Sequence, residues 1–219
     1  MNKVKFVLFS AGISLALVFT FGCSSDDGSD VIYGTPVTYR GETYQTVVIG
    51  RQTWMARNLN YDVNGSKCYN NSQANCKKYG KLYTWATAMV LPDDCNTSVC
   101  ASQINAKHQG ICPSGWHIPS DAEWTTLTNF VGTNAGAKLK ATSDWNRNRN
   151  GNGTDDYGFA ALPGGDGGRS LSGTIGNWWS SSERNAKNAY YRNMEYSHKR
   201  VDRDDDNKSL LYSIRCLQN

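Results

Sequence analysis

The alternation of hydrophobic and polar positions predicts one helix clearly, over residues 121–131. Apolar side chains recur there every three or four residues, as on the buried face of a helix. Ser120 stands at the N-cap position and Glu123 follows three residues later, which is the spacing of a capping box. Residues 116–118 form a short apolar run between a glycine and a proline, which predicts a strand just before the helix. The buried face would carry Trp124, Leu127 and either Phe130 or Val131.

A hairpin is expected near the start of the fold. Residues 44–49 and 52–58 are rich in β-forming side chains and lie on either side of Gly50. Two such runs across a glycine-containing turn predict an antiparallel pair. We expect Trp54 to be a core residue.

The rest of the chain predicts brief helices followed by short strands between long loops. Helices are expected within residues 79–89 and 135–141, polar loops over 64–78 and 144–157, an acidic turn over 200–208, and strands at 157–162, 177–182, 189–196 and 210–217. Helices early and antiparallel strands late predict an α+β domain.

The N-terminus has the pattern of an export signal. Residues 6–21 are apolar apart from Ser10, Gly12, Ser14 and Thr20, with two lysines before them and an acidic stretch after them. The alternative is a membrane-spanning helix, but the run is shorter than the roughly 20 residues that a span needs, and its far flank is not basic. Gly22 and Cys23 resemble the cleavage site of a bacterial lipoprotein, although Thr20 stands where a leucine is usual.

The resemblance to a lipoprotein implies three parts of the chain. Residues 1–22 would be a signal peptide, residues 23–33 a flexible tether and residues 34–219 the folded domain. Cys23 would carry a lipid that holds the protein on the membrane, and Ser24 after it resembles outer-membrane sorting. We therefore expect an exported protein, anchored at the outer membrane or cell surface.

Charge argues against nucleic acid as a partner. Removal of Lys3 and Lys5 with the signal lowers the formal net charge from +4 to +2. The remaining basic residues are scattered among acidic and amide side chains, so no basic face is expected to follow a phosphate backbone.

Cysteine use fits an oxidising compartment. Six cysteines remain when Cys23 is set aside, and six allow 15 pairings. A zinc site is the alternative, but no Cys-x-x-Cys pair is present and the three histidines lack zinc-ligand spacing. Local spacing favours Cys68–Cys76 and Cys95–Cys100 as small loops, which leaves Cys112 for Cys216.

Several segments resemble the Fibrobacter succinogenes major paralogous domain. They occur in order over nearly the whole chain after the tether: TVVIGRQTWMARNLNY (46–61), YGKLYTWATAM (79–89), CPSGWHIPSDAEW (112–124), GNGTDDYGFAALPGG (151–165), NWWSSSE (177–183), NAYYRNMEY (188–196) and NKSLLYSIRCL (207–217). The resemblance implies a secreted or surface domain with a poorly defined molecular activity.

The segment around Trp116 also looks like part of the formylglycine-generating enzymes. Those enzymes share the C-type-lectin-like fold, so the resemblance implies two helices, small antiparallel sheets and long disulfide-stapled loops. A bridge from Cys112 to Cys216 is similar to the long-range bridge of that fold. No catalytic residue carries over, because those enzymes use a late pair of cysteines and only Cys216 is late here. The calcium-binding motifs of lectins are missing as well.

Aromatic side chains give the first candidate site. Trp145, Trp178 and Tyr191 lie in polar loops or late strands, and flat rings beside amides and carboxylates suit a polysaccharide. In a strand, Trp178 and Trp179 would point to opposite faces, so we expect one in the core and one exposed. The alternative is that all of these rings are core.

Acidic side chains give a second candidate, a weak one for calcium. Asp155 and Asp156 lie in a glycine-rich loop, and Asp204 and Asp206 alternate as they would on one face of a strand. An EF-hand is excluded because its glycine and its final glutamate are absent. The alternative is ordinary turns, with no cofactor.

These observations together predict a non-catalytic surface module that binds polysaccharide or another surface ligand. A structural component of the cell envelope and an enzyme distantly like the formylglycine-generating enzymes are the alternatives. A large exposed apolar patch would favour the structural role, and a free cysteine would favour the enzyme.

Overall fold

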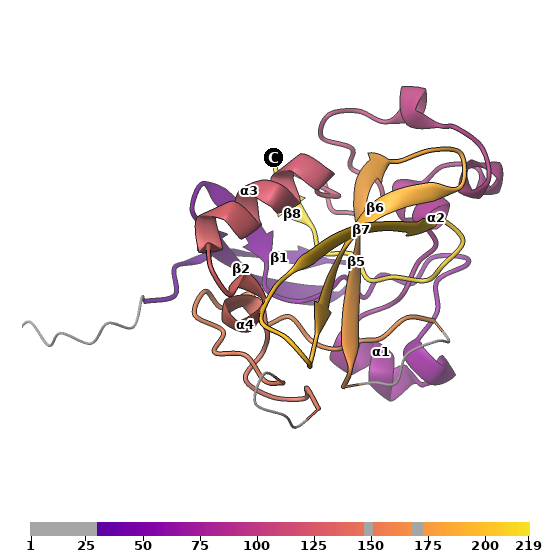
Figure 1. The fold of residues 1–219 in the computed structure, drawn as a ribbon. Helices are drawn as coiled ribbons and strands as arrows, with labels where there is room; N and C mark the ends of the chain where they lie inside the picture. Colours follow the sequence, from indigo (N-terminus) through magenta and orange to yellow (C-terminus); the bar gives the residue numbers. More distant parts are fainter. Residues whose placement is uncertain (1–29, 147–150, 168–172) are drawn as a thin grey trace, which may run out of the picture.

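Two antiparallel sheets form the framework of this computed structural model, which describes residues 30–146, 151–167 and 173–219 (Figure 1). In the first sheet the strand order is β1-β2-β3-β8-β4, and in the second it is β5-β6-β7. The strands are β1 (Tyr33–Tyr39), β2 (Glu42–Ile49), β3 (Gln52–Met55), β4 (Trp116–His117), β5 (Ile175–Glu183), β6 (Asn188–Glu195), β7 (Asp202–Asn207) and β8 (Leu217–Gln218). The predicted hairpin is the β2–β3 pair, and the α+β class is confirmed.

The helices are short, apart from α3. They are α1 (Gln73–Tyr79), α2 (Trp85–Met89), α3 (Asp121–Val131) and α4 (Ala135–Leu139), with 3-10 turns η1 (Tyr69–Asn71), η2 (Asp93–Asn96) and η3 (Ala101–Gln103). No helix among the residues described here is both long enough and apolar enough to span a bilayer. The predicted signal peptide, Cys23 and most of the tether lie outside the described residues.

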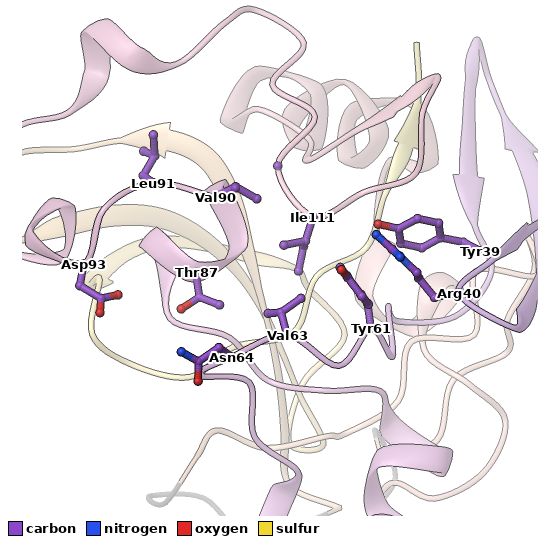
Figure 2. Close-up of a pocket in the computed structure, with 11 residues that line it drawn as sticks. Tyr39, Arg40, Tyr61, Val63, Asn64, Thr87, Val90, Leu91, Asp93 and Ile111 are labelled. Atoms are coloured by element: carbon purple, nitrogen blue, oxygen red, sulfur yellow. The ribbon is translucent and has the colours of Figure 1, made fainter.

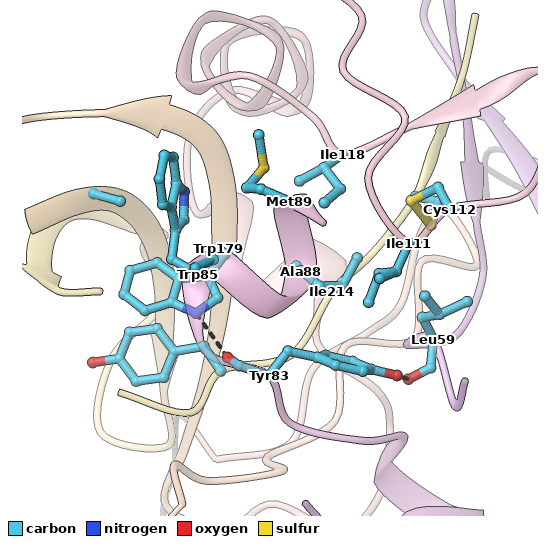
Figure 3. Close-up of a cluster of buried hydrophobic side chains, with 14 of the residues drawn as sticks. Leu59, Tyr83, Trp85, Ala88, Met89, Ile111, Cys112, Ile118, Trp179 and Ile214 are labelled. Carbon is cyan, nitrogen blue, oxygen red and sulfur yellow. Dashed lines mark hydrogen bonds between the residues drawn. A yellow bond between two sulfur atoms is a disulfide. The ribbon is translucent and has the colours of Figure 1, made fainter. Parts of the chain in front are cut away.

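Strand β5 separates two hydrophobic cores. Trp178 points into the core that α3 covers, where its ring centroid lies 6.5 Å from that of Trp124. Trp179 points into the other core, beside Tyr212 and the residues around α2 (Figure 3). Trp54 is fully buried, as predicted. Both faces of β5 are therefore covered, and neither tryptophan of the pair is exposed.

All three predicted disulfides are present. They join Cys68 to Cys76, Cys95 to Cys100 and Cys112 to Cys216. The third ties the segment before β4 to the residue before β8, so the middle of the chain is held against its C-terminal end.

Several predicted elements differ from the structure. Residues 200–208, expected as a turn, contain β7, because the strand is held by its partner β6 and not by its own composition. The loop expected at 64–78 contains α1, and the strand expected at 157–162 is only an isolated bridge between Ala161 and Lys140. Of the strand expected at 210–217, β8 keeps only Leu217.

The fold also begins slightly earlier than position 34. The Val48 amide donates to the Ile32 carbonyl at 2.8 Å, and β1 starts at Tyr33. Val31 already packs against the α3 core.

The capping box at the start of α3 is formed as predicted. Ser120 Oγ accepts from the Glu123 amide at 3.2 Å, while Glu123 Oε2 accepts from the Ser120 amide at 2.8 Å. Glu123 Oε1 also contacts His117 Nε2 at 2.9 Å, which holds His117 as a buried structural residue.

Replacement of Ser120 by alanine should lower the free energy of unfolding by about 1 kcal/mol, because it leaves a helical amide without its acceptor. Urea denaturation would measure the change. The matched control is the exposed Ser114, where alanine should change stability by less than about 0.5 kcal/mol. An equal effect at both serines would contradict the role of the cap.

Candidate functional site

The two tryptophans expected to bind a ligand are core residues. Trp145 is only 3% exposed and donates from its indole nitrogen to the Ala161 carbonyl at 3.0 Å. Trp178 is fully buried and donates to Asn58 Oδ1 at 2.7 Å. Rings in these positions have no open face for a ligand, so the prediction is wrong for both. The reason is tertiary, because both faces of β5 are covered around Trp178 and Trp145 packs into the core that α3 covers.

Tyr191 is half-buried at the edge of the second core. Its ring packs beside the contacting rings of Trp179 and Tyr212, at centroid distances of 6.1 Å and 4.9 Å. Burial, followed by the carboxylates of Asp204 and Asp206, raises the pKa of Tyr191 to about 12. Its phenol stays protonated at neutral pH, and its role in ligand binding stays a prediction.

The acidic candidates already have protein partners. Asp206 accepts from the Tyr212 hydroxyl at 2.9 Å, and Asp204 accepts from the Asp205 amide at 2.9 Å on β7. The other two, Asp155 and Asp156, lie in the loop before Phe159, far from β7 in the sequence. Within the described ranges, no three His, Cys, Asp or Glu side chains gather closely enough to hold a metal ion. The geometry gives calcium no support at these positions.

Asp155 has an unusual environment. Its Oδ1 accepts from the Ala160 amide at 2.7 Å, yet burial raises the pKa of the carboxyl to about 6, against the opposing charge of the buried Arg215. Between about pH 4 and pH 6, the Asp155 carboxyl is therefore protonated in the folded state but already ionised in the unfolded chain.

The raised pKa of Asp155 predicts that the stability of the fold depends on pH. A raised folded pKa means that the contribution of Asp155 is most favourable below about pH 4 and is lost as the pH rises to about 6. Asp155→Asn keeps the acceptor but does not titrate. The stability of the wild type relative to this variant should fall by about 1–2 kcal/mol over that window, after allowance for partial exposure. Urea denaturation at pH 4 and pH 6 tests this, and a constant difference would contradict it.

A groove forms where the β1–β2 turn faces the end of α2 (Figure 2). Its volume is about 490 Å³, within the range of ligand sites. Figure 2 shows Tyr39, Arg40 and Tyr61 on one side and Asn64, Thr87 and Asp93 on the other, with Val63 and Ile111 between them.

The aromatic wall of the groove is organised around Arg40. The rings of Tyr39 and Tyr61 meet edge to face at 5.3 Å between centroids. The Arg40 guanidinium lies 4.9 Å from the Tyr61 centroid and 5.6 Å from that of Tyr39. Arg40 adopts a φ of +50° and Gly41 one of +82°, the left-handed geometry of a tight two-residue turn between antiparallel strands. This turn places the guanidinium over the rings.

Buried contacts hold the walls of the groove. The Tyr61 carbonyl accepts from the hydroxyl of the buried Tyr83 at 2.8 Å. At the floor of the groove, the Ile111 amide donates to the Ala88 carbonyl at 2.9 Å. Val90 ends α2 in a left-handed conformation, and its side chain is 67% exposed. The groove is thus fixed by the core, while its rim stays open to solvent.

No sequence pattern marks this groove, because its residues share no periodicity and come from four separate segments. The one local signal was Arg40-Gly41, a turn dipeptide between two β-forming runs. Nothing in the sequence could show that this turn meets Tyr61 or the end of α2.

The described histidines and cysteines make contacts within the fold. His108 Nε2 lies 2.7 Å from the Met89 carbonyl, His117 contacts Asn219 and Glu123, and His198 lies beside Asp202. Each of the six cysteines that the structure describes is in a disulfide.

Comparison with known proteins gives a family match. A family described as the Fibrobacter succinogenes major domain matches residues 47–218, which covers most of the chain and nearly all of the described fold. Searches of curated proteins and of solved structures returned no match. The family match agrees with the resemblance found in the sequence, and this chain belongs to the Fibrobacter succinogenes major domain family.

Proposed function

We propose that this chain is a non-catalytic binding module and that the groove between Arg40 and Asp93 takes a polysaccharide. The observation that carries the proposal is the pair of tyrosine rings facing amide, hydroxyl and carboxylate groups across an open groove. Sugars present flat C–H faces that pack on aromatic rings, and hydroxyls that pair with such polar groups.

The shape of the site supports an extended ligand. Arg40, Asn64 and Asp93 are exposed at the rim, so a polymer can enter and leave without a conformational change. The floor is apolar, with Val63 and the buried Ile111, which suits the less polar face of a sugar ring. One basic and one acidic residue at opposite ends favour a neutral polymer over a strongly charged one.

The proposal includes the export and anchoring of the chain. Cys23 is the lipidated first residue, and the lipid holds the module at the outer membrane or cell surface, where polysaccharide is met. The fold is proposed to be C-type-lectin-like. In support, the Cys112–Cys216 bridge joins the middle of the chain to its last strand, and β3 pairs with β8 so that early and late strands are neighbours.

Disulfide pairing favours this module over an enzyme similar to the formylglycine-generating enzymes. That chemistry requires a reactive thiol, and Cys216, the one late cysteine, is buried and bridged to Cys112.

Tyr61→Ala should weaken binding to the polysaccharide about tenfold, because it removes a stacking ring worth about 1–2 kcal/mol. A glycan array on the full chain, with and without calcium, would first identify the ligand, and titration calorimetry would give the affinities. Binding should change little with salt, since charge pairing is not its main source.

The matched control is Tyr33→Ala, which removes a 65% exposed tyrosine at the opposite end of β1. It should bind as the wild type does, and both variants should keep the wild-type melting temperature within a few degrees. Unchanged binding by Tyr61→Ala, or no glycan bound at all, would overturn the proposed function.

A further inference from the structure

A second cavity lies at the place where the described chain enters the fold. Its volume is about 730 Å³. It is lined mainly by apolar side chains from the chain entrance, β2, the end of α3 and the loop near residue 157: Val31, Ile32, Val48, Ile49, Phe130 and Tyr157. The groove proposed to bind polysaccharide shares none of these residues.

Exposed apolar side chains gather at the same place. Among the described residues, five large hydrophobic side chains are exposed, and two of them, Ile32 and Phe130, line this cavity. The other three, Tyr33, Val90 and Val99, do not line it. A cluster of this kind at one spot is typical of an interaction surface, whereas single exposed apolar residues are ordinary.

Phe130 is held in its exposed position by the fold. Its ring meets that of Tyr157 edge to face at 6.1 Å between centroids. It also lies over Gly50, where a Cβ atom would come within 2.8 Å of the ring. Gly50 has a φ of +62°, so the β2–β3 turn both requires glycine and leaves room for Phe130. The β2–β3 turn therefore helps to keep the Phe130 ring in its exposed position.

The position of Cys23 in the sequence decides what can cover this surface. Asp30, which lines the cavity, stands seven residues after Cys23. A chain spans at most roughly 3.3–3.6 Å per residue, so this surface stays within about 25 Å of a lipid on Cys23. That short reach keeps bilayer available at this face at high effective concentration, which no soluble partner matches.

We propose that the surface of Ile32 and Phe130 faces the membrane and docks on its lipid surface. The apolar side chains enter the boundary between headgroups and acyl chains, where aromatic and aliphatic groups are favoured. This inference rests on the lipid anchor at Cys23 and is independent of the polysaccharide groove.

Docking would fix the orientation of the binding groove. β1 begins at Tyr33, directly after Ile32, and runs to Tyr39 in the groove, a rise of roughly 20 Å at about 3.3 Å per residue. The groove then opens away from the bilayer, toward material outside the cell.

The test uses the full chain, processed by a bacterial host and placed in phospholipid nanodiscs that contain a gadolinium-chelating lipid. Amide NMR signals near the paramagnetic headgroups lose intensity. Signals of Gly50, Arg51 and Phe130 should lose at least threefold more intensity than those of Arg40 and Val90. Equal loss at the two ends, greater loss at Arg40, or no loss anywhere would overturn the proposal.

Two variants separate docking from simple proximity. Ile32→Ser combined with Phe130→Ser should reduce the difference between the two ends at least twofold, whereas Val99→Ser, a 68% exposed control, should leave it unchanged. The same difference in all three proteins would overturn docking. A dimer in detergent solution that the double variant abolishes would assign the surface to a second copy instead. Glycan binding is measured separately, so failure of this proposal is distinct from failure of the groove.

Discussion

Replacement of both Cys112 and Cys216 by alanine is expected to lower the free energy of unfolding by about 4–5 kcal/mol. The two cysteines are separated by 104 positions, so the bridge closes the longest loop of the three disulfides. In the chain-entropy account, such a bridge stabilises chiefly by restricting the unfolded chain, and the effect grows with loop length. Both sulfurs are also fully buried, so their loss removes packed core atoms.

The matched control is the Cys68–Cys76 bridge, whose cysteines are only eight positions apart. The same account predicts a loss smaller by about 2 kcal/mol for its double alanine variant. Urea denaturation of the two variants and the wild type, at one pH and without reductant, gives the comparison. If the short bridge costs as much as the long one, loop length does not set the stabilisation.

Elements whose signals are local could be predicted from the sequence. The start of α3 depends on Ser120 and Glu123, which are three residues apart, and the structure has the helix with the predicted bounds. The β2–β3 hairpin depends on one glycine turn, and the short disulfides on spacing. In each case, the residues that determine the structure are near neighbours in the chain.

Elements stabilised by distant partners could not be predicted. β7 reads DRDDDN, which has low strand propensity, but β6 supplies a continuous set of pairs for it. Its one basic residue is also paired from far away: Arg203 on β7 and the buried Arg192 on β6 both pair with Asp121 at the start of α3. No window of sequence contains these partners.

The candidate site could not be predicted from the sequence for the same reason. Trp145 and Trp178 were reasonable ligand-binding candidates on composition, but whether a ring is exposed depends on what packs over it. The groove is made by Tyr39 and Tyr61 meeting the end of α2, a contact that only the tertiary fold creates. The exposed Phe130 follows the same rule, since α3 buries Val131 and leaves its neighbour outside.

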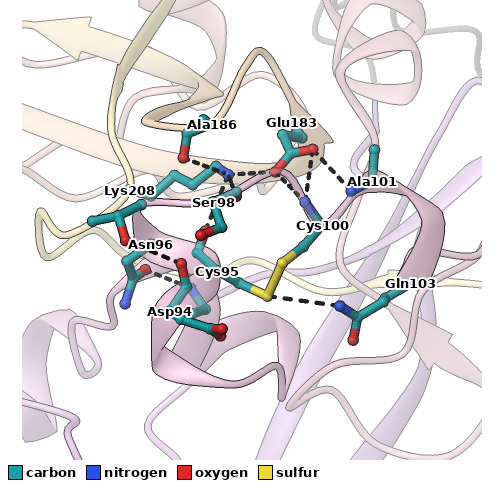
Figure 4. The surroundings of a disulfide bond; sticks show 12 residues. Asp94, Cys95, Asn96, Ser98, Cys100, Ala101, Gln103, Glu183, Ala186 and Lys208 are labelled. Carbon is teal, nitrogen blue, oxygen red and sulfur yellow. Dashed lines mark hydrogen bonds and ion pairs between the residues drawn. A yellow bond between two sulfur atoms is a disulfide. The ribbon is translucent and has the colours of Figure 1, made fainter.

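The second large effect is expected at a buried lysine. The side chain of Lys208 has no exposed surface, and its ammonium donates to the carbonyls of Cys95 and Ser98, each at 3.0 Å, and of Ala186 at 3.2 Å (Figure 4). It also pairs with the carboxylate of Glu183. One buried ammonium group, that of Lys208, therefore donates to all three carbonyls and to the Glu183 carboxylate.

Glu183 extends the network to the disulfide-bonded loop. Its carboxylate accepts from the Cys100 amide at 2.9 Å and from the Ala101 amide at 2.8 Å. The pair thus joins the Cys95–Cys100 loop to the turn between β5 and β6, two segments that are far apart in the sequence. Removal of either partner leaves the other charge buried without its counter-ion, which is far more costly than the loss of an exposed pair.

Lys208→Met should therefore lower the free energy of unfolding by about 3–5 kcal/mol. The matched control is Arg57→Met, which breaks the pair between Arg57 and Glu42. Their side chains are 39% and 32% exposed, so the loss of this pair should cost at most about 1 kcal/mol.

Adding Glu183→Gln to Lys208→Met should recover part of the loss, because the double variant no longer buries an unpaired charge. Urea denaturation of the wild type, Lys208→Met, Glu183→Gln, their double variant and Arg57→Met gives the coupling and the comparison. Equal losses at Lys208 and Arg57, or strictly additive losses at Lys208 and Glu183, would show that this network does not hold the loop in place.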